Sequence, residues 1–326
     1  MAPDITHRTV STNGIEMHVA ESGEGPLVVL CHGFPELWSS WRHQLEALAA
    51  AGYHVVAPDQ RGYGDTDAPA AVEDYDIVHL TDDMVGLLDA VGEERATFVG
   101  HDWGAMVVWS LALRHPERVR AVVGMSVPAT PRGPMQPTEL MRQLFGDTFF
   151  YILYFQQPGV ADAELGADPT KSLRAFMYTI AGDAPEGAWT VLPAAGTGLL
   201  DSLSDTDVPP PWLPETELDA VAATFARTGF TGGLNWYRNI DRNWERSEAW
   251  GERKIEMPSM FVAGERDPVL LMAPPTMMDG LVTDLRESVL LPGAGHWVQQ
   301  ERPAEVNEAL LRFLGSLPPN PVSDDE

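Results

Sequence analysis

The residue with the clearest chemical meaning is Asp102. It stands at the centre of the pentapeptide Gly100-His101-Asp102-Trp103-Gly104. Residues 96–99 before it are apolar and β-prone, and residues 104–115 after it have the pattern of a buried helix that Pro116 ends. A strand, a sharp Gly-x-X-x-Gly turn and a helix together raise the central side chain above the edge of a sheet. The pattern therefore predicts that Asp102 is a nucleophile.

An aspartate at such a turn predicts a different reaction from the serine that usually occupies it. An activated serine suits acyl carbons, because its intermediate there is a labile ester. A serine that attacked a saturated carbon would be left as an ether, which water cannot cleave. A carboxylate that attacks a saturated carbon becomes an ester, and water can release it. We therefore expect Asp102 to attack an sp3 carbon and either open a ring or displace a leaving group there.

A base and an acid to orient it follow Asp102 along the chain. Asp267 and His296 each come directly after an apolar, strand-like run, and His296 lies in a glycine-rich loop. The order nucleophile, acid, histidine is typical of nucleophiles on this kind of turn. Both positions fall at the carboxyl edge of a sheet, where open α/β sheets place their sites. We expect His296 to act as base and Asp267 to orient it, with Glu265 as a neighbouring competitor for the acid.

Two backbone N–H groups, those of Phe34 and Trp103, are the expected oxyanion donors. Phe34 lies in the loop His32-Gly33-Phe34-Pro35 after an early strand, and Trp103 directly follows the nucleophile. Both can face the oxygen of a tetrahedral intermediate. Pro35 predicts a cis peptide bond. We expect His32 to brace this loop through a buried hydrogen bond rather than to take part in catalysis.

The rest of the chain supplies the elements that hold these residues. Strand and helix signals alternate through the first part, which predicts an α/β fold with a doubly wound, mostly parallel sheet. The expected strands are 15–20, 26–31, 54–57, 96–99, 119–125, 259–264 and 288–291, and the expected helices 38–50, 79–91, 104–115 and 303–314.

The middle of the chain, residues 129–250, breaks this alternation. It is rich in aromatic residues, proline and glycine and has few strand signals. We expect a helical cap here, inserted between the two parts of the core, 1–128 and 251–317. Residues 318–326 have the composition of a disordered acidic tail.

Composition limits the possible partners and compartment. Acidic residues outnumber basic ones 48 to 21, for a formal charge of −27, which disfavours nucleic acid and anionic membranes as partners. The first residues lack a basic, apolar leader, and no apolar run approaches the roughly 18–20 residues of a membrane helix. A cytoplasmic monomer or homodimer is expected. The single cysteine, Cys31, excludes an internal disulfide.

The chain resembles the soluble epoxide hydrolases of the α/β-hydrolase fold, which have an aspartate nucleophile and a cap. The motifs that carry the resemblance, within residues 5–315, are His32-Gly33-Phe34-Pro35-Glu36, Arg61-Gly62-Tyr63-Gly64 and Gly100-His101-Asp102-Trp103-Gly104. In the cap, segments 151–159 and 235–239 resemble those that carry the paired tyrosines of these enzymes. By position, Tyr151 and Tyr237 correspond to that pair, and Tyr154, one helical turn from Tyr151, is the main competitor.

The resemblance implies that an epoxide and water become a vicinal diol without a metal or an organic cofactor. Asp102 would attack an epoxide carbon while two phenols hold the oxygen and meet its developing charge. Water activated by His296 would then cleave the ester. The expected substrate is a small apolar epoxide in a pocket lined by Phe34, Trp103, Tyr154, Phe155 and Trp297.

Two other functions stay open at this point. A haloalkane dehalogenase has the same Asp–His–acid set, and Trp103 could solvate a halide there. The second halide donor of that family is often an asparagine after the His-Gly pair, where this chain has Phe34, and fluoroacetate dehalogenases typically place arginine at the position of Trp103. A non-catalytic receptor of the same fold is disfavoured because Asp102, Asp267 and His296 are all present.

Overall fold

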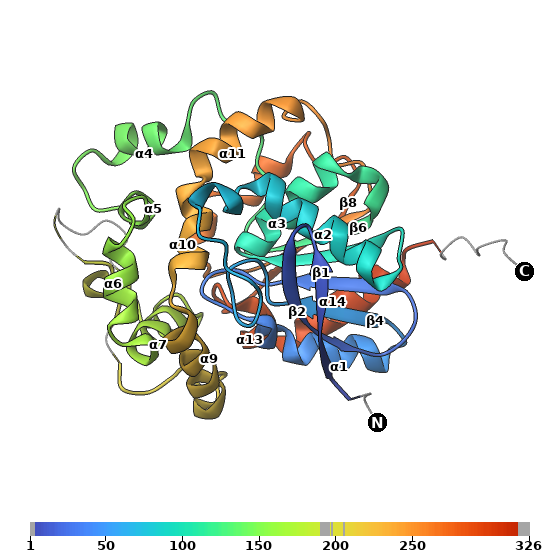
Figure 1. The fold of residues 1–326 in the computed structure, drawn as a ribbon, viewed down its shortest axis with the longest axis horizontal. Coiled ribbons are helices and arrows are strands. Elements are labelled where there is room, and N and C mark those ends of the chain that lie inside the picture. Colours follow the sequence, from blue (N-terminus) through green and yellow to red (C-terminus); the bar gives the residue numbers. More distant parts are fainter. Residues whose placement is uncertain (1–3, 190–195, 197, 205, 319–326) are drawn as a thin grey trace, which may run out of the picture.

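An eight-stranded sheet forms the centre of the molecule (Figure 1). The computed structural model describes residues 4–189, 196, 198–204 and 206–318. In spatial order the strands are β1 (Thr6–Thr12), β2 (Ile15–Ser22), β4 (His54–Pro58), β3 (Leu27–Cys31), β5 (Ala96–His101), β6 (Val119–Met125), β7 (Ser259–Gly264) and β8 (Leu285–Leu291). β2 is antiparallel to β1 and β4, and the other neighbours are parallel. The predicted doubly wound, mostly parallel sheet is confirmed.

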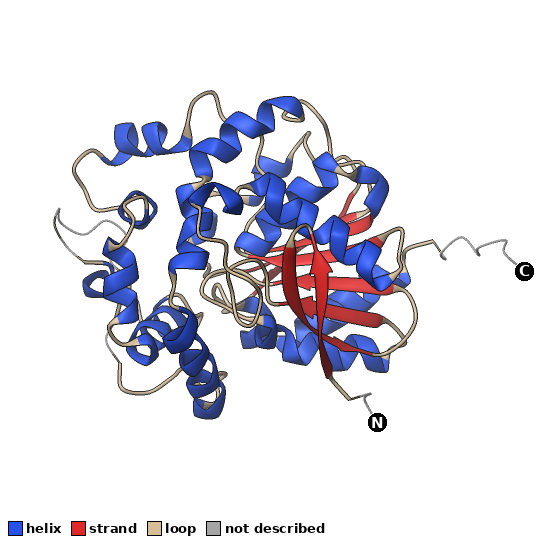
Figure 2. Cartoon of the chain, in the orientation of Figure 1, coloured by secondary structure: helices blue, strands red, loops and turns tan. Residues whose placement is uncertain are grey.

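Helices cover both faces of this sheet (Figure 2). α1 (Arg42–Ala50), which follows a short 3₁₀ turn at Trp38–Trp41, and α14 (Pro303–Gly315) pack on one face, whereas α2 (Ile77–Val91) and α3 (Trp103–Arg114) pack on the other. Every residue of β3, β5 and β7 is buried. Burial on both faces explains why these strands are continuous apolar runs instead of alternating ones.

The described part of the chain between β6 and β7 consists of helices and loops beside the carboxyl edge of the sheet (Figure 1). Its helices are α4 (Pro137–Phe145), α5 (Tyr151–Phe155), α6 (Val160–Gly166), α7 (Pro169–Thr179), α8 (Leu199–Ser202), α9 (Glu215–Thr228), α10 (Thr231–Arg238) and α11 (Ile240–Arg246). This is the expected helical insertion, and 129–250 are its proposed limits. Among the described helices, none is long and apolar enough to cross a membrane. Residues 319–326 of the expected tail lie outside the described residues.

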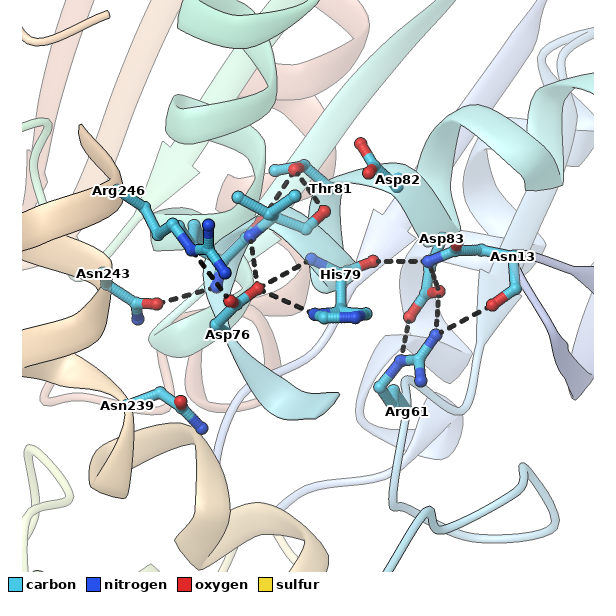
Figure 3. A network of polar contacts seen from close by, with 12 residues as sticks. Asn13, Arg61, Asp76, His79, Thr81, Asp82, Asp83, Asn239, Asn243 and Arg246 are labelled. Carbon is cyan, nitrogen blue, oxygen red and sulfur yellow. Dashed lines mark hydrogen bonds and ion pairs between the residues drawn. The ribbon is translucent and has the colours of Figure 1, made fainter. Parts of the chain in front are cut away.

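Polar contacts dock helix α11 on the start of α2 (Figure 3). The side-chain oxygen of Asn243 accepts a hydrogen bond from the N–H of Ile77 at 2.7 Å. Arg246 places its Nε 3.5 Å from Oδ2 of Asp76. Asp76 is also the N-cap of α2, since its other carboxylate oxygen accepts from the N–H of Val78. The insertion is therefore joined to the core at the first turn of α2.

A buried ion pair supports the neighbouring helix α10, which carries Tyr237. Arg61 donates from Nε and Nη2 to the two carboxylate oxygens of Asp83 at 2.7 and 2.6 Å (Figure 3). Only 4% and 1% of these side chains are exposed. The carbonyl of Arg61 accepts a hydrogen bond from the indole N–H of Trp236 at 3.1 Å. The pair thus fixes the loop against which Tyr237's helix packs.

Asp83→Ala is expected to lower the free energy of unfolding by about 3–5 kcal/mol, because it leaves the Arg61 guanidinium buried without a counter-charge. The matched control is Asp82→Ala. Asp82 pairs with Arg114 at 2.8 Å, but its side chain is 37% exposed, so a change within about 1 kcal/mol is expected. Urea denaturation of both variants measures the difference. Equal losses in the two variants would contradict a special role for the buried pair.

Candidate active site

Asp102 occupies the sharp turn between β5 and α3. Its backbone has φ +53° and ψ −120°, a conformation that is costly for any residue with a side chain and that persists only where the surrounding structure enforces it. Gly104 lets the start of α3 lie directly against the end of β3, because a Cβ at this position would collide with the carbonyl oxygen of Cys31. The turn therefore holds the Asp102 side chain at the carboxyl end of β5, as the sequence pattern predicts.

The structure brings Asp102, Asp267 and His296 together. Nδ1 of His296 lies 3.1 and 3.0 Å from the two carboxylate oxygens of Asp267. Its Nε2 lies 3.6 Å from Oδ2 of Asp102. His296 and Asp267 are buried, whereas Glu265 is exposed. The imidazole thus lies between the two carboxylates, and Asp267 rather than Glu265 contacts it.

The surroundings of this trio shift its protonation. Burial lowers the pKa of His296, but the charge of Asp267 and the contacts with both carboxylates raise this pKa well above its ordinary value. Burial raises the pKa of Asp102, but the hydrogen bond and charge of His296, the charge of His101 and the N–H of Phe34 hold it below its ordinary value. Asp102 is therefore ionised at neutral pH, which is the nucleophilic form of a carboxylate.

Phe34 presents its N–H to the nucleophile at 2.9 Å from Oδ1 of Asp102. The peptide bond between Phe34 and Pro35 is cis, as predicted. Trp103 begins α3, so its N–H is one of the first-turn groups that have no partner within a helix. His32 contacts the carbonyl of Gly33 at 2.9 Å and accepts from a loop N–H at 3.1 Å through its other nitrogen. The expected bracing role of His32 is confirmed.

The two predicted cap tyrosines approach Asp102 from different helices. Tyr151 begins α5 and Tyr237 lies in α10, and their ring centroids are 6.1 Å apart. Tyr237 packs edge-on against Trp103, with ring centroids 5.0 Å apart. Burial and then the charge of Asp102 raise the pKa of both phenols. Both groups consequently remain protonated hydrogen-bond donors at neutral pH.

Asp102, Tyr151 and Tyr237 line two adjoining cavities. The larger one has a volume of about 410 Å³ and is lined mainly by apolar side chains, including Trp103, Met106, Ile152, Trp244, Trp250 and Met272. The smaller one has a volume of about 50 Å³ and also contacts His296. Its lining includes Phe34, Phe155 and Trp297. Four of the five predicted pocket residues thus lie at a cavity, and the nucleophile faces both spaces.

Comparisons with known proteins agree with this geometry. Residues 26–303 match the family model of the alpha/beta hydrolase fold. The chain is 52% identical to Epoxide hydrolase A of Mycobacterium tuberculosis, over 96% of this chain and 98% of that protein. It is 42% identical to Epoxide hydrolase 1 of Siraitia grosvenorii, over 95% and 98% of the two chains. The crystal structure of Epoxide Hydrolase A from Mycobacterium thermoresistibile superimposes with a TM-score of 0.93 at 54% identity, covering 97% of this chain and 99% of that one.

The chain belongs to the epoxide hydrolase family of the α/β-hydrolase fold. This membership confirms the resemblance drawn from the motifs. It also favours an epoxide hydrolase over the dehalogenase and the receptor, which share the fold.

One predicted pocket residue of this epoxide hydrolase is wrong. Tyr154 does not line either cavity, and its hydroxyl donates to a carboxylate oxygen of Glu164 at 2.8 Å. Although Tyr154 and Tyr151 both lie in α5 (Tyr151–Phe155), the carboxylate of Glu164 on α6 binds the Tyr154 hydroxyl away from the cavities. Of the two tyrosines, Tyr151 is the one that lines the cavities.

The histidine loop of this epoxide hydrolase is held by His101, for which a bracing hydrogen bond is expected as for His32, and by Ser126, which the sequence analysis did not assign. The carbonyl of His296 accepts from the hydroxyl of Ser126 at 2.7 Å and lies 2.8 Å from Nε2 of His101. His101 in turn contacts Glu36 at 2.7 Å through Nδ1. Ser126 directly follows β6, so its place at the carboxyl edge was a usable signal. Its contact is with a backbone carbonyl, for which the sequence has no signal.

Proposed function

We propose that this member of the epoxide hydrolase family converts an apolar epoxide and water into a vicinal diol through a covalent ester on Asp102. The observation that carries the proposal is the meeting of three kinds of group at the same cavities. A carboxylate, two phenols and an imidazole with its orienting acid all converge there. Each has one chemical task in opening a strained ring and hydrolysing the resulting ester.

In the first half-reaction, a carboxylate oxygen of Asp102 attacks a ring carbon and the bond from that carbon to the epoxide oxygen breaks. Oδ1 is bound by the N–H of Phe34 at 2.9 Å, whereas Oδ2 lies on the side of His296. We assign the attack to Oδ2, which leaves Oδ1 as the ester carbonyl in its hydrogen bond. Tyr151 and Tyr237 hold the epoxide oxygen, and one of them transfers a proton to it as negative charge develops.

In the second half-reaction, His296 removes a proton from water while the water oxygen attacks the carbonyl carbon of the ester. The tetrahedral oxyanion forms on Oδ1, where the N–H groups of Phe34 and Trp103 stabilise it. The intermediate expels the diol oxygen, which takes a proton from the imidazolium. The acid left on Asp102 loses its proton and restores the phenol. The net change is the addition of one water to the epoxide.

The protonation of His296 is linked to the formation of the ester. Asp102 is one of the groups that raise the pKa of His296 in the free enzyme. Alkylation converts this carboxylate into a neutral ester, so that contribution disappears and the pKa of His296 falls. This fall favours the neutral imidazole in the intermediate, which is the state that has to activate water.

The test of the proposed function uses His296→Gln, mixed separately with styrene oxide and with 1-chlorohexane and analysed by intact and peptide mass. Alkylation does not need the imidazole but ester hydrolysis does, so one epoxide-sized adduct per chain is expected on the Asp102 peptide. His43→Gln, a half-buried histidine on α1, is the control and should show full turnover without adduct accumulation. An adduct from 1-chlorohexane alone would move the function to a dehalogenase, and no adduct from either reagent would contradict covalent catalysis.

A further inference from the structure

Glu301 is a buried carboxylate that has no task in the mechanism above. It ends the short helix α13 (Val298–Glu301) and is 8% exposed. Its Oε2 accepts hydrogen bonds from the N–H groups of Gly182 at 2.8 Å and Gly295 at 2.9 Å. Its Oε1 accepts from the N–H of Trp297 at 3.0 Å. Two of these donors flank His296 in the chain, and the third belongs to the cap.

At Gly182, a segment of the cap crosses the histidine loop, and the two backbones are in direct contact. The N–H of His296 donates to the carbonyl of Ile180 at 2.9 Å. A Cβ at Gly295 would collide with the N of Gly182, and one at Gly182 would collide with the carbonyl oxygen of Gly293. Only glycines allow the cap segment and the histidine loop to lie this close. The N–H side of the His296 peptide is therefore bound to the cap, and its carbonyl side to His101 and Ser126 of the core.

A second side chain holds the same turn of the cap. Arg266 donates from Nη1 to the carbonyl of Gly182 and from Nη2 to the carbonyl of Ala184, the latter at 3.0 Å. Its own N–H donates to the carbonyl of Ala294 at 2.9 Å. Arg266 and Glu301 thus bind opposite polar groups of one cap residue, Gly182, and both are anchored next to His296.

We propose that Glu301 is a positioning residue that joins the cap to the loop of His296, so that the cap helps to place the base for ester hydrolysis. The inference rests on the proposed function. Alkylation of Asp102 does not use the imidazole, whereas hydrolysis requires it within hydrogen-bond reach of a water beside the ester. Loosening the joint should therefore slow the second half-reaction selectively. A misplacement of about 1 Å at a reacting group can cost roughly a hundredfold in rate.

Glu301→Gln tests this directly, because an amide has one acceptor oxygen and leaves at least one of the three N–H groups without a partner. Rapid-quench mixing with excess styrene oxide yields the alkylation rate constant, the hydrolysis rate constant and the fraction of active sites. The hydrolysis rate constant is expected to fall roughly ten- to a hundredfold and the alkylation rate constant to change by less than about twofold, so the alkyl-enzyme accumulates. A purely structural role would lower the fraction of active sites and leave the ratio of the two constants unchanged.

Two further variants complete the experiment. Glu305→Gln, an exposed glutamate in the first turn of α14, removes the same charge and should leave both constants unchanged. Arg266→Gln loosens only the cap side and changes an exposed residue, so it remains informative if Glu301→Gln fails to fold. It should lower the hydrolysis constant severalfold. An unchanged ratio in the folded variants would overturn the inference while leaving the proposed function intact, whereas a parent enzyme that forms no alkyl-enzyme would overturn both.

Discussion

Replacing Asp102 by asparagine is expected to lower kcat for epoxide hydrolysis by roughly 10⁴-fold or more. The amide is a poor nucleophile for a saturated carbon, and the charge that attacks the ring is lost. Binding of the epoxide should change little. The amide oxygen can still accept the hydrogen bond that the Phe34 N–H donates to Oδ1 at 2.9 Å, and the rest of the cavity lining is mainly apolar. Diol formation measures kcat, and quenching of tryptophan fluorescence measures binding.

The source of the diol oxygen distinguishes a nucleophile from a general base at this position. In a single turnover in ¹⁸O water, a covalent mechanism puts an oxygen of Asp102 into the diol and solvent oxygen into the carboxylate. A general base would deliver ¹⁸O to the diol in the first turnover. Asp89→Asn, which changes an aspartate whose side chain is 67% exposed, should keep full activity. Label in the first diol, or substantial activity in Asp102→Asn, would contradict the ester mechanism.

The strands β3, β5 and β7 were predictable from the sequence because they are continuous apolar runs. β8 (Leu285–Leu291) alternates in exposure, and only its last part, 288–291, was predicted. The expected strand 119–125 coincides with β6 (Val119–Met125). β1 (Thr6–Thr12) was missed, since five of its seven residues are exposed and it has few apolar side chains. A usable signal existed, because Asn13 and Gly14 both have positive φ and Asn-Gly favours the tight turn of a hairpin.

The site residues also fall into two groups: the sequence pattern predicts the positions of some, and tertiary packing determines the positions of the others. Asp102, Asp267 and His296 follow strands, so the sheet itself brings them to one edge. The choice of Tyr151 over Tyr154 depends on Glu164, which lies on another cap helix and which the motif does not include. Glu301 accepts hydrogen bonds from backbone N–H groups of two segments of the chain that cross. Nothing in a single sequence identifies such a crossing.

Removing both cap hydroxyls, by Tyr151→Phe with Tyr237→Phe, is expected to lower the alkylation rate constant by roughly 10³- to 10⁴-fold. Ring opening leaves negative charge on the epoxide oxygen, and these phenols are the donors that meet it at the cavity they share with Asp102. Each single variant should retain one donor and lose roughly ten- to a hundredfold. The loss should exceed the product of the singles if one phenol substitutes for the other as proton donor.

Tyr154→Phe is the matched control, because Tyr154 lies on the same helix as Tyr151 but does not line either cavity. The hydroxyl that this substitution removes is bound to Glu164. Its alkylation rate constant should stay within about twofold of the parent enzyme, whereas a large loss would restore Tyr154 as the donor.

The pH dependence of alkylation adds an independent check on the two phenols. Burial and the charge of Asp102 raise the pKa of Tyr151 and Tyr237, so the phenols donate until the pH exceeds the ordinary tyrosine value of about 10. The alkylation rate constant of the parent enzyme should therefore show no decline below that pH from loss of the phenolic protons. A decline that both phenylalanine substitutions abolish would contradict the raised pKa values.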